Sequence, residues 1–105
     1  MLFVETRIFT EDITALLSDE GYRRLQLALL LRPEQGVLIR GSGGLRKIRW
    51  GATGRGKRGG VCVIYYWEPR EAECLMLYAY PKSAQEDLTT AQLKVLRRVV
   101  REEFG

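Results

Sequence analysis

The feature that most constrains the fold is a pair of long apolar runs separated by one short turn. The first run is Val61 to Trp67 (VCVIYYW), and the second is Glu73 to Tyr80 (ECLMLYAY). The residues between them, Glu68-Pro69-Arg70-Glu71, are typical of a turn. Because continuous apolar strands belong in the interior of a sheet, we predict that the first run lies at the centre of the sheet and that the second returns beside it.

The flanking sequence predicts five further elements. In chain order these are a strand over Leu2 to Phe9, a short helix over Asp12 to Leu17, a helix from the N-cap Ser18 to about Arg32, a strand over Leu45 to Trp50 and a C-terminal helix after Thr89. Gly36 to Arg40 is a candidate for an additional short strand. The order β-α-α-β-β-β-α predicts one α+β domain over residues 1–105, with a small antiparallel-dominated sheet, two N-terminal helices and one C-terminal helix.

The C-terminal helix has the clearest sequence signals. Thr89 and Gln92 have the spacing of a capping box, and Leu88 and Leu93 have that of a hydrophobic staple. One face repeats apolar residues at Leu93, Leu96 and Val100, while the opposite face carries Lys94, Arg97, Arg98 and Arg101. We expect the apolar face to pack on the sheet.

Positive charge is concentrated in residues 36–67. This segment contains no acidic residue, and its cations are Arg40, Arg46, Lys47, Arg49, Arg55, Lys57 and Arg58. The rest of the chain carries 10 basic and 13 acidic residues, so the net charge of +4 originates in one third of the sequence. A patch of this kind indicates a polyphosphate partner, the alternative being a solvated basic face.

Alternation along the strand predicted at 45–50 separates its cations. Lys47 and Arg49 fall on one face of the sheet, and Arg46 falls on the other. Tyr66 and Tyr78, on neighbouring strands, are candidates for stacking on bases. The predicted surface thus combines cations and aromatic rings, as RNA-binding surfaces do.

The loop over residues 51–60 (GATGRGKRGG) differs from the nucleotide-binding loops that it superficially resembles. Gly56-Lys57 is followed by Arg58 where a phosphate-binding loop needs Ser or Thr, and the loop leads into a strand instead of a helix. Glycines between cations instead suit close approach to a nucleic-acid backbone.

The chain contains no histidine, which excludes a Ser-His-Asp triad, a Cys-His pair and a His-ligated zinc site. RNA cleavage remains chemically accessible, because a lysine among cations can act as a base and arginines can stabilise the phosphorane. Lys47 fits the role of base and equally that of a plain phosphate-binding group. No Asp or Glu lies in the cationic segment, so we expect neither a metal nor a carboxylate mechanism, and no cofactor.

The two cysteines are expected to remain unpaired. A turn at residues 69–72 would place Tyr66 opposite Cys74 and Cys62 opposite Tyr78. The cysteines would then lie out of register, which predicts two small core residues and no disulfide.

Four segments carry a combined motif: residues 43–49 (GGLRKIR), 54–60 (GRGKRGG), 63–66 (VIYY) and 77–82 (LYAYPK), the last followed by 86–89 (EDLT). The combination resembles the RelE superfamily of bacterial toxins, especially its HigB branch, over nearly the whole chain. The resemblance implies a microbial-ribonuclease-like fold. It also implies metal-independent cleavage of messenger RNA in the A site of the 70S ribosome, by attack of the 2′-hydroxyl.

The same resemblance implies partners and a location. The chain would be inhibited by an antitoxin, often a helix-turn-helix DNA-binding protein in this branch, and would reach operator DNA only through that antitoxin. We expect a cytoplasmic protein without membrane contact, since the N-terminal residues lack signal-peptide features and no run approaches the ~20 apolar residues of a membrane span.

The resemblance also assigns site residues. Lys47 and Arg49 match active-site positions, Lys82 matches a basic position after the last strand, and Arg58 lies near the site. Nucleic-acid binding would fall to the remaining basic and aromatic candidates, which are Arg40, Arg46, Arg55, Lys57, Tyr66 and Tyr78.

One position departs from the family pattern. Cys62 stands where many relatives carry an arginine that stabilises the transition-state phosphate. Either Arg58 or Arg55 substitutes for it, or the chain is a weakened or inactive toxin. Three hypotheses follow: a ribosome-dependent endoribonuclease, a non-catalytic module that binds RNA or ribosomes, and a structural partner in a repressor complex.

Overall fold

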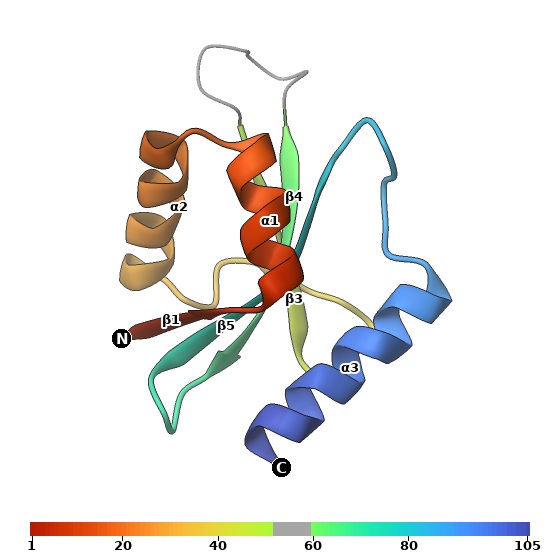
Figure 1. The fold of residues 1–105 in the computed structure, drawn as a ribbon. Coiled ribbons are helices and arrows are strands. Elements are labelled where there is room, and N and C mark those ends of the chain that lie inside the picture. The colour runs from red at the N-terminus through yellow and green to blue at the C-terminus, as the bar shows by residue number, and fades with distance from the viewer. Residues whose placement is uncertain (52–59) are drawn as a thin grey trace.

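A computed structural model describes residues 1–51 and 60–105, which contain a five-stranded sheet (Figure 1). The strands are β1 (Leu2–Glu5), β2 (Val37–Leu38), β3 (Leu45–Trp50), β4 (Val61–Glu68) and β5 (Glu73–Pro81). Their spatial order is β1-β5-β4-β3-β2, with β1 parallel to β5 and the other neighbours antiparallel. The apolar runs β4 and β5 thus occupy interior positions, and the candidate strand at 36–40 is present as β2.

Helices cover both faces of this sheet (Figure 1). Helices α1 (Arg7–Leu16) and α2 (Asp19–Leu31) share one core cluster with the sheet, and α3 (Thr90–Phe104) shares a second. The first cluster contains Phe9 and Leu25, and the second contains Leu96. The α+β class is therefore confirmed, with two N-terminal helices and one C-terminal helix. Within the described residues, no helix has both the length and the apolar character needed to cross a bilayer.

The first strand and first helix have different bounds from those predicted. β1 ends at Glu5 and α1 begins at Arg7, so the predicted strand over Leu2 to Phe9 and helix over Asp12 to Leu17 are wrong in extent. The reason lies at Thr6. Its hydroxyl accepts a hydrogen bond from Phe9 N at 3.1 Å as the N-cap of α1, and donates one to Leu77 O at 3.0 Å. This cap begins the helix early and fixes it to β5.

The other helix starts follow the sequence signals. Ser18 caps α2 by accepting a hydrogen bond from Gly21 N at 3.0 Å, and α2 ends one residue before its C-cap Arg32. Thr89 and Gln92 form the predicted capping box at the start of α3. Polar side chains at fixed offsets therefore located these boundaries correctly.

The β4–β5 hairpin has a different register from the predicted one. Trp67, not Tyr66, lies opposite Cys74, and Cys62 lies opposite Tyr80 instead of Tyr78. The turn closes with Glu68 opposite Glu73, and a register shift at Ile64/Tyr65 adds one residue to the β5 side. Both cysteines are buried and free, as predicted, and they belong to different core clusters.

Candidate functional site

The alternation of β3 places neighbouring cations on opposite faces of the sheet. Leu45 belongs to the core cluster on the α3 side, whereas Ile48 belongs to the cluster under α1 and α2. Lys47 and Arg49 have the same parity as Leu45 and therefore face the α3 side, while Arg46 faces the other side. The predicted separation of these three cations is thus present in the fold.

Two rows of residues cross the sheet on the α3 side. Lys47 pairs with Ile64, which pairs with Tyr78; Arg49 pairs with Cys62, which pairs with Tyr80. Side chains in such a row stand next to one another on the same face. The two rows place the cations of β3 on the same face as Tyr78 and Tyr80 of β5, with one residue of β4 between them.

Lys47 makes contacts with the segment that joins β5 to α3 (residues 82–89, hereafter the β5–α3 segment). Its Nζ donates to Asp87 Oδ1 at 2.8 Å and to the Glu86 carbonyl oxygen at 3.4 Å. The Lys47 side chain is 24% exposed, and that of Asp87 is 78% exposed. Lys47 therefore contacts a largely exposed carboxylate while its own side chain is mostly covered.

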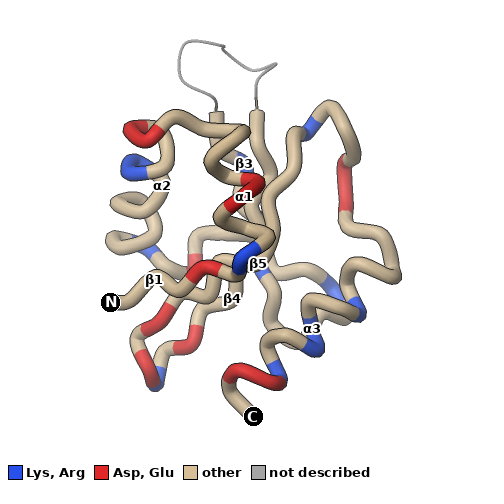
Figure 2. Tube along the Cα trace, in the orientation of Figure 1, with Lys and Arg blue, Asp and Glu red and all other residues tan. Residues whose placement is uncertain are grey.

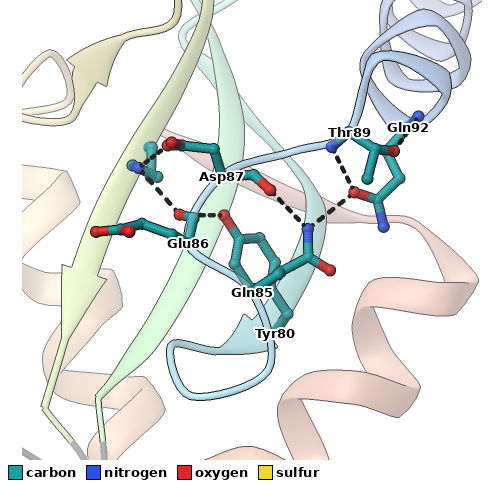
Figure 3. Close-up of polar contacts among 7 residues, drawn as sticks. Tyr80, Gln85, Glu86, Asp87, Thr89 and Gln92 are labelled. Atoms are coloured by element: carbon teal, nitrogen blue, oxygen red, sulfur yellow. Dashed lines mark hydrogen bonds and ion pairs between the residues drawn. The ribbon is translucent and has the colours of Figure 1, made fainter.

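The β5–α3 segment is held in place by hydrogen bonds to both of its neighbours (Figure 3). Gln85 Nε2 donates to Asp87 O and to Gln92 Oε1, both at 2.9 Å, and Gln92 Oε1 also accepts from Thr89 N. At the other end, the Tyr80 hydroxyl donates to Glu86 O at 3.4 Å. The capping box of α3 therefore extends into a network that holds Asp87 against Lys47.

Arg49 and Lys82 lie together at a shallow pocket. They line a cavity of about 250 Å³ with Trp50, Gly51 and Gly60, and both cations are exposed. The Lys82 backbone N–H donates to Gly60 O at 3.0 Å, which fixes the end of β5 beside the start of β4. The structure thus brings two of the predicted catalytic residues to one site, where an anion could contact both.

The predicted residues of the glycine-rich loop, Arg55, Lys57 and Arg58, lie outside the described residues. Within residues 1–51 and 60–105, no group of three His, Cys, Asp or Glu side chains is placed to hold a metal ion. The chemistry that the described site offers is therefore that of cations, hydroxyls and one carboxylate.

The remaining predicted nucleic-acid residues have varied surroundings. Arg40 is exposed before the β2–β3 turn. Arg46 donates from Nη1 to Glu34 O at 2.9 Å and to Gly36 O at 2.8 Å, so its guanidinium holds a loop on the α1/α2 side. Tyr66 packs its ring against Phe104 at a centroid distance of 5.6 Å.

Tyr78 is half-buried beside Tyr80, with ring centroids 5.6 Å apart, and its hydroxyl accepts from Gln92 Nε2 at 3.3 Å. Arg46, Tyr66 and Tyr78 therefore all have intramolecular partners, whereas Arg40 is exposed in the manner expected of a contact to a phosphate.

Comparison with known proteins bears on the fold. No family model matches the sequence. A solved structure of the E. coli toxin RelE, a double arginine-to-alanine mutant in the free state, superposes with a TM-score of 0.61. The two sequences are 15% identical, and the match covers 95% of each chain. The fold is RelE-like.

Within this RelE-like fold, Cys62 occupies a core position. It is fully buried between Arg49 and Tyr80, at the position where the resemblance leads us to expect an arginine. Burial, together with the Cys62 thiol and the hydrogen bond to it, raises the pKa of Tyr80 above its ordinary value. Beside Arg49, this row therefore holds a thiol and a phenol where the resemblance leads us to expect a second cation.

Asp87 is the site residue that sequence reasoning missed. No carboxylate lies within the cationic segment of the sequence, but the RelE-like fold brings one to it from forty residues away. A signal was present, because Glu86-Asp87 belongs to the motif at 86–89 that follows the last strand. It could not be connected to Lys47 without knowing the path of the β5–α3 segment.

Proposed function

We propose that this chain is a ribosome-dependent endoribonuclease that cleaves messenger RNA, and the toxin of a toxin–antitoxin pair. The observation that carries the proposal is the placement of Lys47 and Arg49 on one face of a RelE-like sheet, with Lys82 beside Arg49. The name of the E. coli neighbour, a toxin, supports the toxin assignment.

The described residues suit the electrostatic part of RNA cleavage. Attack of a 2′-hydroxyl on the adjacent phosphate concentrates negative charge on the phosphorane oxygens, and fixed cations stabilise that charge. Arg49 and Lys82 line one pocket and can share one phosphate. Lys47 already pairs with an anionic group, the Asp87 carboxylate, which favours phosphate binding as its role.

RNA binding at this site requires Lys47 to exchange partners. Asp87 now occupies the position that a phosphate oxygen would take, at a distance typical of a charge-assisted hydrogen bond. Because Asp87 is mostly exposed, the ion pair is worth only about 0.2–1 kcal/mol. A polyanion that also contacts Arg49 and Lys82 can displace it.

A second candidate function is a catalytically weak homologue that binds RNA or ribosomes and acts mainly in an autoregulatory complex with its antitoxin. The buried Cys62 favours it, since a thiol supplies no charge to the phosphorane. Loss of one such stabilising group typically lowers a rate by about 10²–10³. Under both candidates, the partners are the 70S ribosome with mRNA in its A site and an antitoxin of the helix-turn-helix class.

The experiment that separates these functions is mRNA cleavage on programmed ribosomes by the wild-type chain and by Cys62→Arg. The proposal predicts cleavage by the wild type, and none when the A-site nucleotide 5′ of the cut carries a 2′-deoxy sugar. Cleavage by Cys62→Arg alone would establish the weakened homologue. If neither chain cleaves mRNA although both are folded, the proposal that this chain is an endoribonuclease is wrong.

A further inference from the structure

The outer face of α3 carries a row of cations that the candidate site does not use. Its members are exposed and lie at i, i+3, i+4 and i+7 spacing: Lys94, Arg97, Arg98 and Arg101. We call these four residues the α3 basic face, and together they line a shallow groove of about 270 Å³. Figure 2 shows basic residues recurring along this helix. In residues 1–51 and 60–105, the ion pairs formed involve other cations, namely Arg24, Arg46, Lys47 and Arg70.

The arrangement contributes little to the stability of the helix, although Arg101 lies in the last turn, where a cation suits the helix dipole. Lys94 and Arg98 are a like-charged i,i+4 pair, and so are Arg97 and Arg101. Each such pair destabilises a helix by about 0.2–0.5 kcal/mol. The packing of α3 on the sheet depends on its opposite side, where Leu96 is buried. Neither the stability of the helix nor its packing on the sheet therefore requires four cations on this face.

The residues of the α3 basic face suit a phosphate backbone better than a protein or a membrane. In the part of the chain that the structure describes, only cations line the groove, and no aromatic or apolar side chain lines it to form the core that a protein–protein interface usually has, although arginine itself is common in such interfaces. A bilayer surface would need the apolar side of the helix, but that side packs on the sheet. Successive helical turns present positive charge roughly every 5 Å along the axis, close to the spacing of phosphates along a nucleic-acid strand.

The α3 basic face also adjoins the cationic segment. Arg97 Nε would lie 3.8 Å from a Cβ placed on Gly43, so Arg97 lies beside the Gly41–Gly44 turn that joins β2 to β3. Arg40, exposed, immediately precedes that turn. Positive charge therefore extends from α3 to the start of the strand that carries Lys47.

We propose that the α3 basic face binds the phosphate backbone of double-helical RNA, as a second contact outside the Lys47 site. The choice of RNA among polyanions rests on the proposed function. A double helix presents phosphates on a rigid surface that a straight helix can follow, and backbone contacts of this kind need no particular base sequence. The face would hold the chain on structured RNA while the Lys47 site acts on a single strand.

The test is binding of a fluorescent RNA hairpin over a series of salt concentrations, with Lys47→Ala as the background so that the RNA stays intact. One variant replaces the four cations of the α3 basic face by Gln. A matched control replaces four exposed cations of α1, α2 and the α2 C-cap by Gln, namely Arg7, Arg23, Arg24 and Arg32. Circular dichroism verifies that both remain folded.

We expect the α3 variant to bind the hairpin about tenfold more weakly or worse, and to lose about 1 from its salt slope for each cation that contacts a phosphate. The control variant should bind like the background chain. A charge-preserving variant, with Arg97, Arg98 and Arg101 changed to Lys, should keep the salt slope, which shows that charge and not helix disruption is being measured.

An equal loss of hairpin affinity in the α3 variant and in the control would overturn the proposal, because the net charge of the chain alone would then explain RNA binding. It would also fail if the α3 variant kept hairpin binding but lost binding to polyglutamate, which would indicate an acidic protein partner. The binding assay does not depend on cleavage. A chain that fails to cleave mRNA on ribosomes could therefore still bind the hairpin through α3. Conversely, loss of the α3 proposal would not contradict the proposed endonuclease.

Discussion

The two faces of the sheet hold their polar groups in different ways. On the α1/α2 side, two aromatic side chains bond to backbone atoms: the Tyr65 hydroxyl donates to Pro33 O at 2.7 Å and accepts from Gly36 N at 2.9 Å, and Trp50 Nε1 donates to Gly21 O at 3.1 Å. On the α3 side, Lys47 bonds chiefly to an exposed carboxylate. Backbone partners cannot leave without local unfolding, whereas Asp87 can be exchanged for another anion.

Arg46 and Lys47 show this contrast in adjacent residues. Arg46 holds two carbonyl groups of the α2–β2 connection, and its side chain is 17% exposed. Lys47 is comparably buried, at 24%, but its strongest partner is largely in solvent. The two cations therefore differ in the nature of their partners and not in charge or burial.

The largest expected effect comes from removing the two cations of the pocket on the α3 side. Arg49→Gln combined with Lys82→Gln should lower mRNA cleavage on ribosomes by about 10³ or more, because the proposed function assigns both charges to stabilising the phosphorane. Thermal stability should change little, since both side chains are exposed. The matched control is Arg7→Gln with Arg23→Gln, which removes the same amount of charge elsewhere on the surface. A similar loss of mRNA cleavage in this control would mean that the two faces of the sheet do not differ in function.

On the α1/α2 side, the expected effect is on stability. Tyr65→Phe removes a hydroxyl with two backbone partners and leaves the Gly36 N–H without its bond in a buried position. Urea denaturation should show a loss of about 2 kcal/mol, with cleavage unchanged at temperatures where the variant is folded. A variant of wild-type stability but low cleavage would contradict the assignment of this face to structure.

The smallest effect concerns the exchangeable partner. Asp87→Asn removes the charge that competes with RNA for Lys47, so the affinity for a non-cleavable 2′-deoxy substrate analogue should rise about two- to fivefold. Glu86→Gln is the matched control, because it makes the same charge change one residue away, and Glu86 contributes its backbone carbonyl to the site. An equal rise in both variants would mean that only net charge matters.

The sequence predicted what depends on local periodicity and capping. Alternation in β3 put Lys47 and Arg49 on one face and Arg46 on the other, and the Thr89–Gln92 spacing located the start of α3. Both follow from neighbouring residues alone. The RelE-like order of elements and the central hairpin were likewise accessible from apolar runs.

Features that depend on distant contacts were not accessible. The register of the β4–β5 hairpin was predicted wrongly because the shift at Ile64/Tyr65 leaves no local pattern. The early start of α1 depends on the contact between Thr6 and Leu77, 71 residues apart. The Lys47–Asp87 contact joins residues 40 apart through a segment without regular structure. Each requires the assembled sheet.

The most direct test of the contrast between the faces is mRNA cleavage on programmed ribosomes by Arg46→Gln and Lys47→Gln, measured beside their urea denaturation curves. We predict that Lys47→Gln retains wild-type stability and loses cleavage by about 10² or more, whereas Arg46→Gln is less stable by about 1–2 kcal/mol and cleaves at the wild-type rate. The reverse pattern, with cleavage lost in Arg46→Gln and retained in Lys47→Gln, would contradict the account.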